Sequence, residues 1–268
     1  MPRRGEDPGW RPITALFALL AGFGGALFGA VVVGVTAGLF GASLTDPPPA
    51  VSIIGTVVQD VCLVGSALFF ARLAARPLPS QFGLRAVRFW PAAGWALAAY
   101  AAFYAFTAVW VSLLGTKPVD QNLPKELGAD KSTVALIAVA LLVSVIAPLA
   151  EEFFFRGYFY GALRNWNVWA ATLITGLVFG AIHAGSAQWE FLLPLAFFGA
   201  SLCWLRERTG SLYPGIVLHC ANNSIAFGVS QDWGWEIGAL FLASVSVIWV
   251  VAILVRTRWD ASAAVPAI

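Results

Sequence analysis

The sequence predicts an all-α membrane protein, a polytopic bundle of about eight spanning helices. Hydrophobic residues make up 59% of the chain and charged residues only 11%, whereas about a quarter of an ordinary soluble domain is charged. Apolar runs of about 20 residues, the length that crosses a hydrocarbon core of ~30 Å, recur along the chain. We therefore expect residues 1–268 to form one integral membrane domain that contacts the lipid bilayer and binds no nucleic acid.

The apolar runs define eight expected helices. They are residues 13–40, 50–75, 90–114, 133–160, 167–185, 190–205, 212–231 and 237–255. The first run is too long and too rich in glycine for a signal-peptide core, so we expect a retained helix. Its Gly25/Gly29 and Gly34/Gly38 pairs have the spacing that lets helix backbones approach closely.

The connections between these helices predict the orientation of the chain. With the N-terminus in the cytoplasm, all thirteen arginines lie on the inner side or on a span running towards it, and only Lys117, Lys125 and Lys131 lie outside. This asymmetry follows the positive-inside rule, so we expect both termini in the cytoplasm, in a bacterial inner membrane. Residues 78–90 mix arginines with large apolar side chains and predict an amphipathic segment at the inner interface. Residues 115–132 predict a solvated external connection.

The fourth expected helix carries charges in an unusual place. No charged residue occurs from 132 to 150, and Glu151, Glu152 and Arg156 then follow within six positions. Because an ionisable side chain is costly in hydrocarbon, such a residue indicates a functional site. The chain has only two histidines, His183 and His219, and both fall in apolar segments.

Four of the polar residues are expected at similar depths. With a rise of 1.5 Å per residue, Glu151 lies ~21 Å and His183 ~27 Å above the inner face. By the same rise, His219 lies ~14 Å and Asn223 ~20 Å above it. Three different helices thus bring these side chains to the middle of the membrane, which indicates a functional site there.

Helical spacing also pairs the polar residues. Glu152 with Arg156 and His219 with Asn223 are four residues apart and share a helix face, as do Phe179 and His183. The first pair predicts an ion pair, which leaves Glu151, turned by ~100°, to act as a general base. Each pair taken alone could instead be structural. Asp60, in the second span, is expected to pair with an inner-side arginine or to face a wet cavity.

The residue types narrow the chemistry. The sequence lacks an H-E-x-x-H helix, a G-x-S-G serine element and paired aspartate motifs at membrane depth. The three cysteines lack metal or redox spacing, so we expect them to pack in the core. A glutamate, two histidines and an asparagine remain, and these side chains can activate water and stabilise a tetrahedral oxyanion.

At these residues the chain resembles the CPBP family of intramembrane proteases, which includes the CAAX prenyl proteases and bacterial Abi-type proteins. The family pattern is E-E-x-x-x-R, then F-x-x-x-H, then H-x-x-x-N/D. Here it reads Glu151-Glu152-x-x-x-Arg156, Phe179-x-x-x-His183 and His219-x-x-x-Asn223. The resemblance covers about residues 130–230, the expected catalytic core.

The resemblance implies a catalytic cavity within the membrane, in which an endopeptidase hydrolyses membrane-associated proteins or peptides with a glutamate-activated water. Glu151 would be the general base, His183 would help to hold the water, and His219 with Asn223 would form the oxyanion site. Glu152 and Arg156 would orient the first motif helix, with Phe179 in a supporting role.

Three alternatives stay open at this point. Glu151, His183 and His219 could form a His₂Glu zinc site, although we favour a mechanism without metal or other cofactor. The fold could serve as a non-catalytic scaffold or immunity partner. A proton-relay transporter using Glu151 and Asp60 is the third, but no inverted repeat supports it.

Overall fold

The computed structural model describes residues 8–43, 45–115 and 123–263, with side chains up to Thr257. The orientation prediction also used Arg3, Arg4, Lys117 and the Arg258 side chain, which lie outside the described residues.

Helices account for nearly all of the described chain. Eight long helical segments correspond to the eight expected spans, and one of them, residues 133–164, is continuous through several helix types. The segments are α1 (Pro12–Leu39), α2 (Pro49–Ala74), α4 (Phe89–Leu114), α6 to α8 (Thr133–Arg164), α9 (Val168–Ala181), α10 (Trp189–Thr209), α11 (Tyr213–Ser230) and α12 (Glu236–Ala263). Two four-residue helices, α3 (Pro79–Phe82) and α5 (Leu123–Glu126), lie in connections. No strand occurs in this described part, so the all-α prediction is confirmed.

Five of these segments are long and apolar enough to cross a membrane: α1, α2, α4, the continuous segment 133–164, and α12. Their outer faces are covered with large apolar side chains such as Phe28, Leu97 and Trp249, which are 72%, 70% and 67% exposed. Water would not tolerate such a continuous apolar surface, whereas lipid does. The protein is therefore a multi-pass membrane protein.

Local sequence signals set the ends of the helices. Proline occupies the first turn of α1, α2 and α11, where its missing N–H would have no helical partner anyway. The side chains of Ser132 and Asn167 accept hydrogen bonds from the backbone N–H groups of Ala135 and Ala170 and so begin α6 and α9. Gly115 and Gly210, both with positive φ, end α4 and α10.

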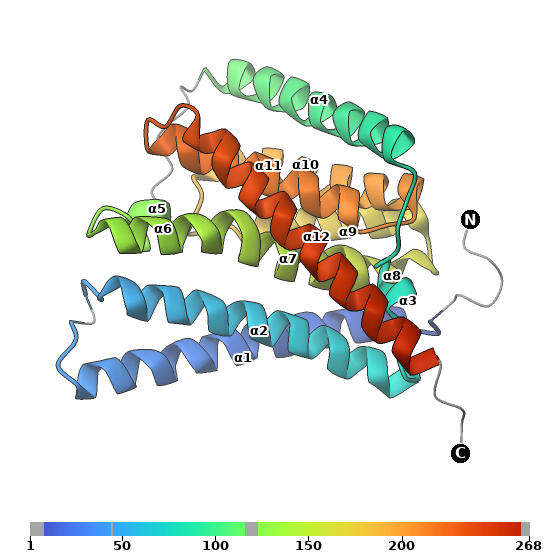
Figure 1. Cartoon of the computed structure of the whole chain (residues 1–268), viewed down its shortest axis with the longest axis horizontal. Helices are drawn as coiled ribbons and strands as arrows, with labels where there is room; N and C mark the ends of the chain where they lie inside the picture. Colours follow the sequence, from blue (N-terminus) through green and yellow to red (C-terminus); the bar gives the residue numbers. More distant parts are fainter. Residues whose placement is uncertain (1–7, 44, 116–122, 264–268) are drawn as a thin grey trace.

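The helices run roughly along the long axis of the molecule (Figure 1). α1 and α2 form a hairpin on one side, and α2 packs against the segment that carries the glutamates. α10 packs between α9 and α4, while α12 crosses obliquely and packs on α11. α1 begins and α12 ends at the same end of the bundle.

Small residues permit the closest helix contacts. A Cβ added at Gly25 would lie 3.3 Å from Cys62 Sγ, so the Gly25/Gly29 face packs against α2 as predicted. At Gly34 an added Cβ meets nothing within 4 Å, so no helix approaches closely at this glycine in the described structure. A Cβ at Gly180 would lie 2.5 Å from the Leu192 carbonyl oxygen, which shows how closely α9 approaches α10.

The charged side chains separate between the two ends of the bundle. The end where α1 begins holds nine arginines with placed side chains: Arg11, Arg72, Arg76, Arg85, Arg88, Arg164, Arg206, Arg208 and Arg256. The opposite end holds two lysines and six acidic residues: Asp46, Lys125, Glu126, Asp130, Lys131, Glu190, Asp232 and Glu236. The segregation expected from the sequence is thus present in three dimensions.

Two connections bury apolar side chains. Within residues 78–90, the predicted interfacial segment, Phe82 is buried and its ring stacks on Phe153, while Phe89 and Trp90 are 70% and 82% exposed. The described part of 115–132 is not simply solvated, contrary to its prediction: Leu127 and Ala129 are buried, and they pack in an apolar cluster with Val139 and Phe227. In both cases, the apolar side chains between the charges find a place in the core.

Candidate active site

The motif-bearing helix contains two π-helical stretches, η1 (Leu142–Ile146) and η2 (Phe153–Phe159), on either side of α7 (Ala147–Glu152). Such stretches are rare and frequently occur at functional sites. Pro148 lies between them and has no backbone N–H. Its nitrogen therefore cannot donate to the Val143 carbonyl, as a π-helix would require, or to the Ser144 carbonyl, as an α-helix would require.

Side chains from later helices satisfy both carbonyl groups. The Asn223 amide donates from Nδ2 to the Val143 oxygen at 3.0 Å, and Ser244 Oγ donates to the Ser144 oxygen at 3.3 Å. A free carbonyl is costly in a membrane interior, so these contacts hold α11 and α12 in register with α7. Asn223 is thereby placed one helical turn from His219.

Glu152 and Arg156 form the predicted ion pair in the core. Arg156 Nη1 lies 2.8 Å from Glu152 Oε1, and both side chains are almost completely buried. Arg156 Nη2 also donates to the Gly199 carbonyl at 3.1 Å, and its guanidinium lies over the Phe179 ring at 4.2 Å. Phe179 therefore supports the arginine through a cation–π contact.

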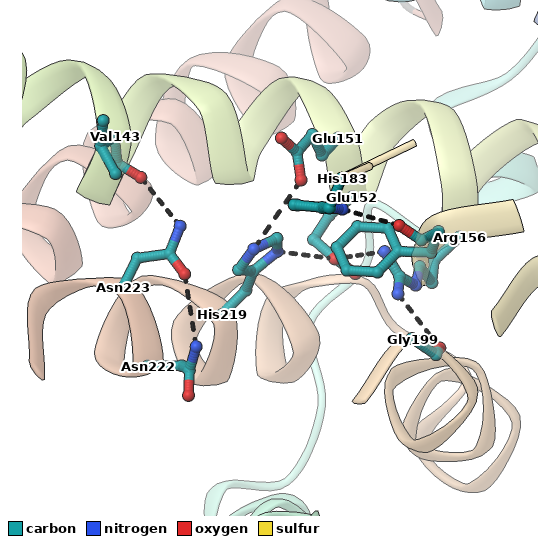
Figure 2. A network of polar contacts seen from close by, with 10 residues as sticks. Val143, Glu151, Glu152, Arg156, His183, Gly199, His219, Asn222 and Asn223 are labelled. Atoms are coloured by element: carbon teal, nitrogen blue, oxygen red, sulfur yellow. Dashed lines mark hydrogen bonds and ion pairs between the residues drawn. The ribbon is translucent and has the colours of Figure 1, made fainter. Parts of the chain in front are cut away.

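Glu152 has a second partner that the sequence did not indicate. Its Oε1 also lies 2.9 Å from His219 Nδ1, as Figure 2 shows. A carboxylate can only accept in this bond, so Nδ1 carries the proton and Nε2 faces the other glutamate. His219 Nε2 lies 3.8 Å from Glu151 Oε2, too far for a direct hydrogen bond.

The two glutamates thus occupy different environments. Glu152 is bonded to two side chains, whereas Glu151 Oε2 has no hydrogen-bond partner among the described residues. Glu151 is also the more accessible, with 14% of its side chain exposed. Because neighbouring residues on a helix point ~100° apart, Glu152 can bond other side chains in the core while Glu151 remains available for chemistry.

His183 does not lie on a helix, contrary to the expected span of 167–185. α9 ends at Ala181, and His183 lies in the following turn. Its Nδ1 is 2.7 Å from the Phe179 carbonyl oxygen, which must accept, so Nε2 remains available to a ligand. With 14 residues, α9 is only ~21 Å long, and this shortness brings the turn and its histidine to the cavity.

A cavity of about 390 Å³ connects these side chains. Glu151, His183, His219, Asn222 and Asn223 line it, whereas Glu152 and Arg156 do not. Its walls include Leu123 and Leu127 beside α5 and Gly185 and Ser186 after α9. These residues belong to connections at the lysine-containing end of the bundle, and none of the lining residues comes from the arginine-rich connections.

Three further features of the site were not predicted from the sequence. Asn222 lines the cavity and donates to Asn223 Oδ1 at 3.4 Å. The Phe198 ring meets the His219 ring edge-on at 5.6 Å. A Cβ at Gly215 would lie 3.3 Å from Glu152 Oε2, so this glycine lets α11 approach the carboxylate.

Asp60 was expected to pair with an arginine or to face a wet cavity, and neither expectation holds for the described residues. Its side chain is buried and both carboxylate oxygens have no hydrogen-bond partner there. Its neighbour Gln59 lines the cavity instead.

The described residues do not fit the zinc alternative as they stand. No group of three His, Cys, Asp or Glu side chains among them converges closely enough to hold a metal ion. In addition, the closest contact of His219 is made to Glu152, which is not one of the expected ligands.

Comparison with known proteins places the chain in a family. A family model for type II CAAX prenyl endopeptidase Rce1-like proteins matches residues 133–225. A protein of Escherichia coli named "Uncharacterized 24.3 kDa protein" is 36% identical over 174 residues, which is 62% of this chain and 73% of that protein. The chain belongs to the Rce1-like family.

Other relatives of the Rce1-like chain match over shorter stretches. "Putative membrane peptidase YdiL" of Bacillus subtilis (strain 168) is 32% identical over 91 residues, 32% of this chain and 36% of that protein. "UPF0177 protein YxdF" of Lactococcus lactis subsp. lactis (strain IL1403) is 29% identical over 82 residues, 31% of this chain and 44% of that protein. No solved structure matches the chain.

The family model matches the part of the chain that carries the predicted site residues. All seven residues predicted for the site, from Glu151 to Asn223, lie within the matched residues 133–225. The chain is thus a multi-pass membrane protein of a protease family.

Proposed function

We propose that this protein is an intramembrane endopeptidase in which Glu151 activates a water molecule to cleave membrane-associated proteins or peptides. The observation that carries the proposal is the difference between the two glutamates. Glu152 Oε1 is held by Arg156 and His219 away from the cavity, while Glu151 lines the cavity and its Oε2 meets His219 Nε2 only at 3.8 Å. A carboxylate that lines a cavity without a direct hydrogen bond is suited to accept a proton.

In this mechanism Glu151 takes a proton from water as the water oxygen attacks the carbonyl carbon of the peptide bond. The proton then passes to the leaving amine as the C–N bond breaks, so Glu151 ends in its starting state. His183 Nε2 helps to hold the water, because Nδ1 is bonded to the Phe179 carbonyl.

The oxyanion of the tetrahedral intermediate would lie near His219 and Asn223. One amide hydrogen of Asn223 is bonded to Val143, and the second is free to donate. When both ring nitrogens of His219 carry a proton, its Nε2–H donates as well, while Nδ1–H stays bonded to the Glu152 carboxylate. Arg156 balances the charge of Glu152, so the pair positions His219 without itself contacting the substrate.

The open end of the cavity bears on how substrates enter. We place the protein in a bacterial inner membrane with the arginine-rich end in the cytoplasm, as the positive-inside rule requires. Gly185 and Ser186, which follow α9 towards the opposite end of the bundle, line the cavity. Substrates would therefore reach Glu151 from the extracytoplasmic side.

Cleavage is tested with Glu151→Gln. Native and variant proteins, reconstituted in vesicles, are incubated with a quenched fluorescent farnesylated CAAX peptide, and new N-termini are compared in membrane fractions of expressing cells. We expect the variant to lose a factor of about 10²–10⁴ in rate, the usual contribution of a general base. Glu126→Gln, an exposed acid at the same end of the bundle, is the matched control.

Full activity of folded Glu151→Gln protein would reject the assignment of the base. If native protein and Glu151→Gln yield the same N-termini and neither cleaves the peptide, a non-catalytic scaffold explains the protein better. Access is tested separately with Ser186→Cys and Arg76→Cys in intact spheroplasts. Labelling of Arg76→Cys, but not Ser186→Cys, by an impermeant maleimide would reverse the proposed orientation.

A further inference from the structure

Asp60, near the middle of α2, is a buried acid that the proposed mechanism does not use. Only 4% of the residue is exposed, and neither carboxylate oxygen has a hydrogen-bond partner among the described residues. An ionised carboxylate in a membrane interior is costly unless a cation or hydrogen-bond donors compensate its charge. The state of this side chain therefore needs a physical explanation.

Asp60 lies beside the cavity that contains Glu151. Thr56 and Gln59, on the same helix, line this cavity. Thr56 and Asp60 are four residues apart and share a helix face. On that face the next residues towards the arginine-rich end, Leu63 and Ala67, are completely buried. Asp60 thus lies where α2 closes the cavity, one helical turn beyond Thr56.

The neighbouring segment carries Glu151. α2 packs against α7, on which Glu151 lies (Figure 1). Val143, Ala147 and Glu151 follow one another at four-residue intervals, and all three line the cavity. The charge of Glu151 acts on the Asp60 carboxyl group, so the two acids are close enough to influence each other.

The elements packed against α2 give Asp60 no ion pair. α1, α6 and η1 pack on α2 and contain no charged residue. η2 contains Arg156, which is bonded to Glu152 and to the Gly199 carbonyl. Within the described parts of the chain, Asp60 is therefore influenced by a like charge and has no hydrogen-bonded counter-ion.

Two neighbouring acids in this situation cannot both be ionised at low cost, so one of them holds a proton. Glu151 has 14% of its side chain exposed and lies 3.8 Å from His219 Nε2. Asp60 is more deeply buried and has no such neighbour among the described histidines. The proton is therefore better placed on Asp60, and a protonated carboxyl group is a hydrogen-bond donor.

We propose that Asp60 is a protonated positioning residue for Glu151. Its O–H group donates towards the Glu151 carboxylate, directly or through one water molecule, and so keeps the general base ionised and oriented. The proton stays on Asp60 throughout, and Glu151 alone takes a proton from the attacking water and passes it to the leaving amine. This inference rests on the proposed function, because it assigns a role in the same reaction.

The protonation of Asp60 is tested by infrared spectroscopy of the purified full-length protein at neutral pH. A protonated carboxyl group gives a carbonyl band that is separate from the bands of a carboxylate. We expect native protein and Glu151→Gln to show this band and Asp60→Asn to lack it. Absence of the band from native protein would overturn the proposal. Its loss in Glu151→Gln, with retention in Asp60→Asn, would do the same, because Glu151 would then hold the proton.

The role in the reaction is tested by cleavage of the quenched fluorescent peptide. Asp60→Leu removes the donor and should lower kcat by roughly 10- to 100-fold, the contribution of a hydrogen bond to a charged group. KM should change little, because Asp60 does not line the cavity. Asp60→Asn keeps a neutral donor and should retain most of the native kcat. The matched control is Ser66→Ala, at a buried polar residue of the same helix, and it should leave cleavage unchanged.

Thermal unfolding separates this role from a structural one. Replacing a buried acid that has no hydrogen-bond partner by an apolar side chain should not destabilise the protein, so Asp60→Leu should unfold at the native temperature or above. If Asp60→Leu does not fold, Asp60→Ala replaces it in the comparison with Asp60→Asn.

Equal cleavage by native protein and Asp60→Leu, or an equal loss in Asp60→Leu and Asp60→Asn, would overturn this inference. The proposed function would still hold in that case if Glu151→Gln is inactive. Equal cleavage by native protein and Glu151→Gln would instead reject the proposed function itself.

Discussion

The buried Glu152–Arg156 pair offers a test that separates stability from catalysis. We consider Glu152→Gln, Arg156→Met and the double variant. Both side chains are almost completely inaccessible, and Arg156 is otherwise held only by the Gly199 carbonyl and by aromatic rings, among the described residues. Removing one partner therefore leaves the other as a buried charge without its counter-ion.

The expected magnitudes follow from that geometry. Breaking a buried ion pair by removing one member costs about 3–5 kcal/mol, whereas replacing both members by neutral groups of similar volume can be close to neutral. Each single variant should therefore be destabilised by about 3–5 kcal/mol, and the double variant by less than either single. In the double variant the amide oxygen introduced by Glu152→Gln can still accept from His219 Nδ1, but more weakly than a carboxylate. The double variant should thus recover stability without recovering full activity.

The assay is denaturant unfolding in mixed detergent, followed by tryptophan fluorescence, with peptide cleavage measured on the same samples. The matched control is the exposed Lys131–Asp46 pair, whose side chains are 48% and 75% exposed. Lys131→Met with Asp46→Asn should change the free energy of unfolding by at most about 1 kcal/mol. If the core single variants cost no more than this control, the ion pair does not hold the site together. If the double variant regains native activity, Glu152 does not position His219.

Three other predictions follow from individual contacts. Gly180→Ala should destabilise the protein by about 1–3 kcal/mol in denaturant unfolding, because its Cβ would meet the Leu192 carbonyl. In the same assay Gly65→Ala, whose Cβ would meet nothing within 4 Å, should be neutral or slightly stabilising. Asn223→Ala should lower the free energy of unfolding by about 1–3 kcal/mol, because it leaves the Val143 carbonyl without its hydrogen bond, and should also slow cleavage. An unchanged free energy of unfolding would show that this contact does not stabilise the protein. Activity should survive exhaustive chelation, with no zinc found by elemental analysis of the pure protein; loss on chelation and recovery with zinc would restore the metalloprotease alternative.

Much of the architecture could be predicted because the signals are local. The length of each apolar run is compared with a fixed membrane thickness, so the bounds of α1, α2 and α4 agree with the prediction to within one residue. The ion pair of Glu152 and Arg156 was likewise predictable, since both residues lie on one helix at a fixed spacing. The relative depth of Glu151, His219 and Asn223 follows from the same constant rise per residue.

The predictions that failed were made from a short sequence segment, without knowledge of how neighbouring helices pack on it. The expected helix over 167–185 treated His183 as helical, although α9 stops at Ala181. Residues 115–132 were predicted as a solvated connection, but Leu127 and Ala129 are buried in an apolar cluster. Asp60 was given an arginine partner, and no described arginine reaches it.

The sequence by itself determined that this is a membrane-spanning α-bundle and that Glu152 and Arg156 share a helix face, because helix length, depth and spacing are properties of a single segment. Only the tertiary structure decided that Glu152 bonds His219 as well as Arg156, that Asn223 satisfies a carbonyl left free by Pro148, and which residues line the cavity. These features depend on the rotation of each helix about its axis and on contacts across up to 80 residues of chain. The close packing of the helices sets these rotations and contacts, and the pattern of residues along the sequence does not reveal them.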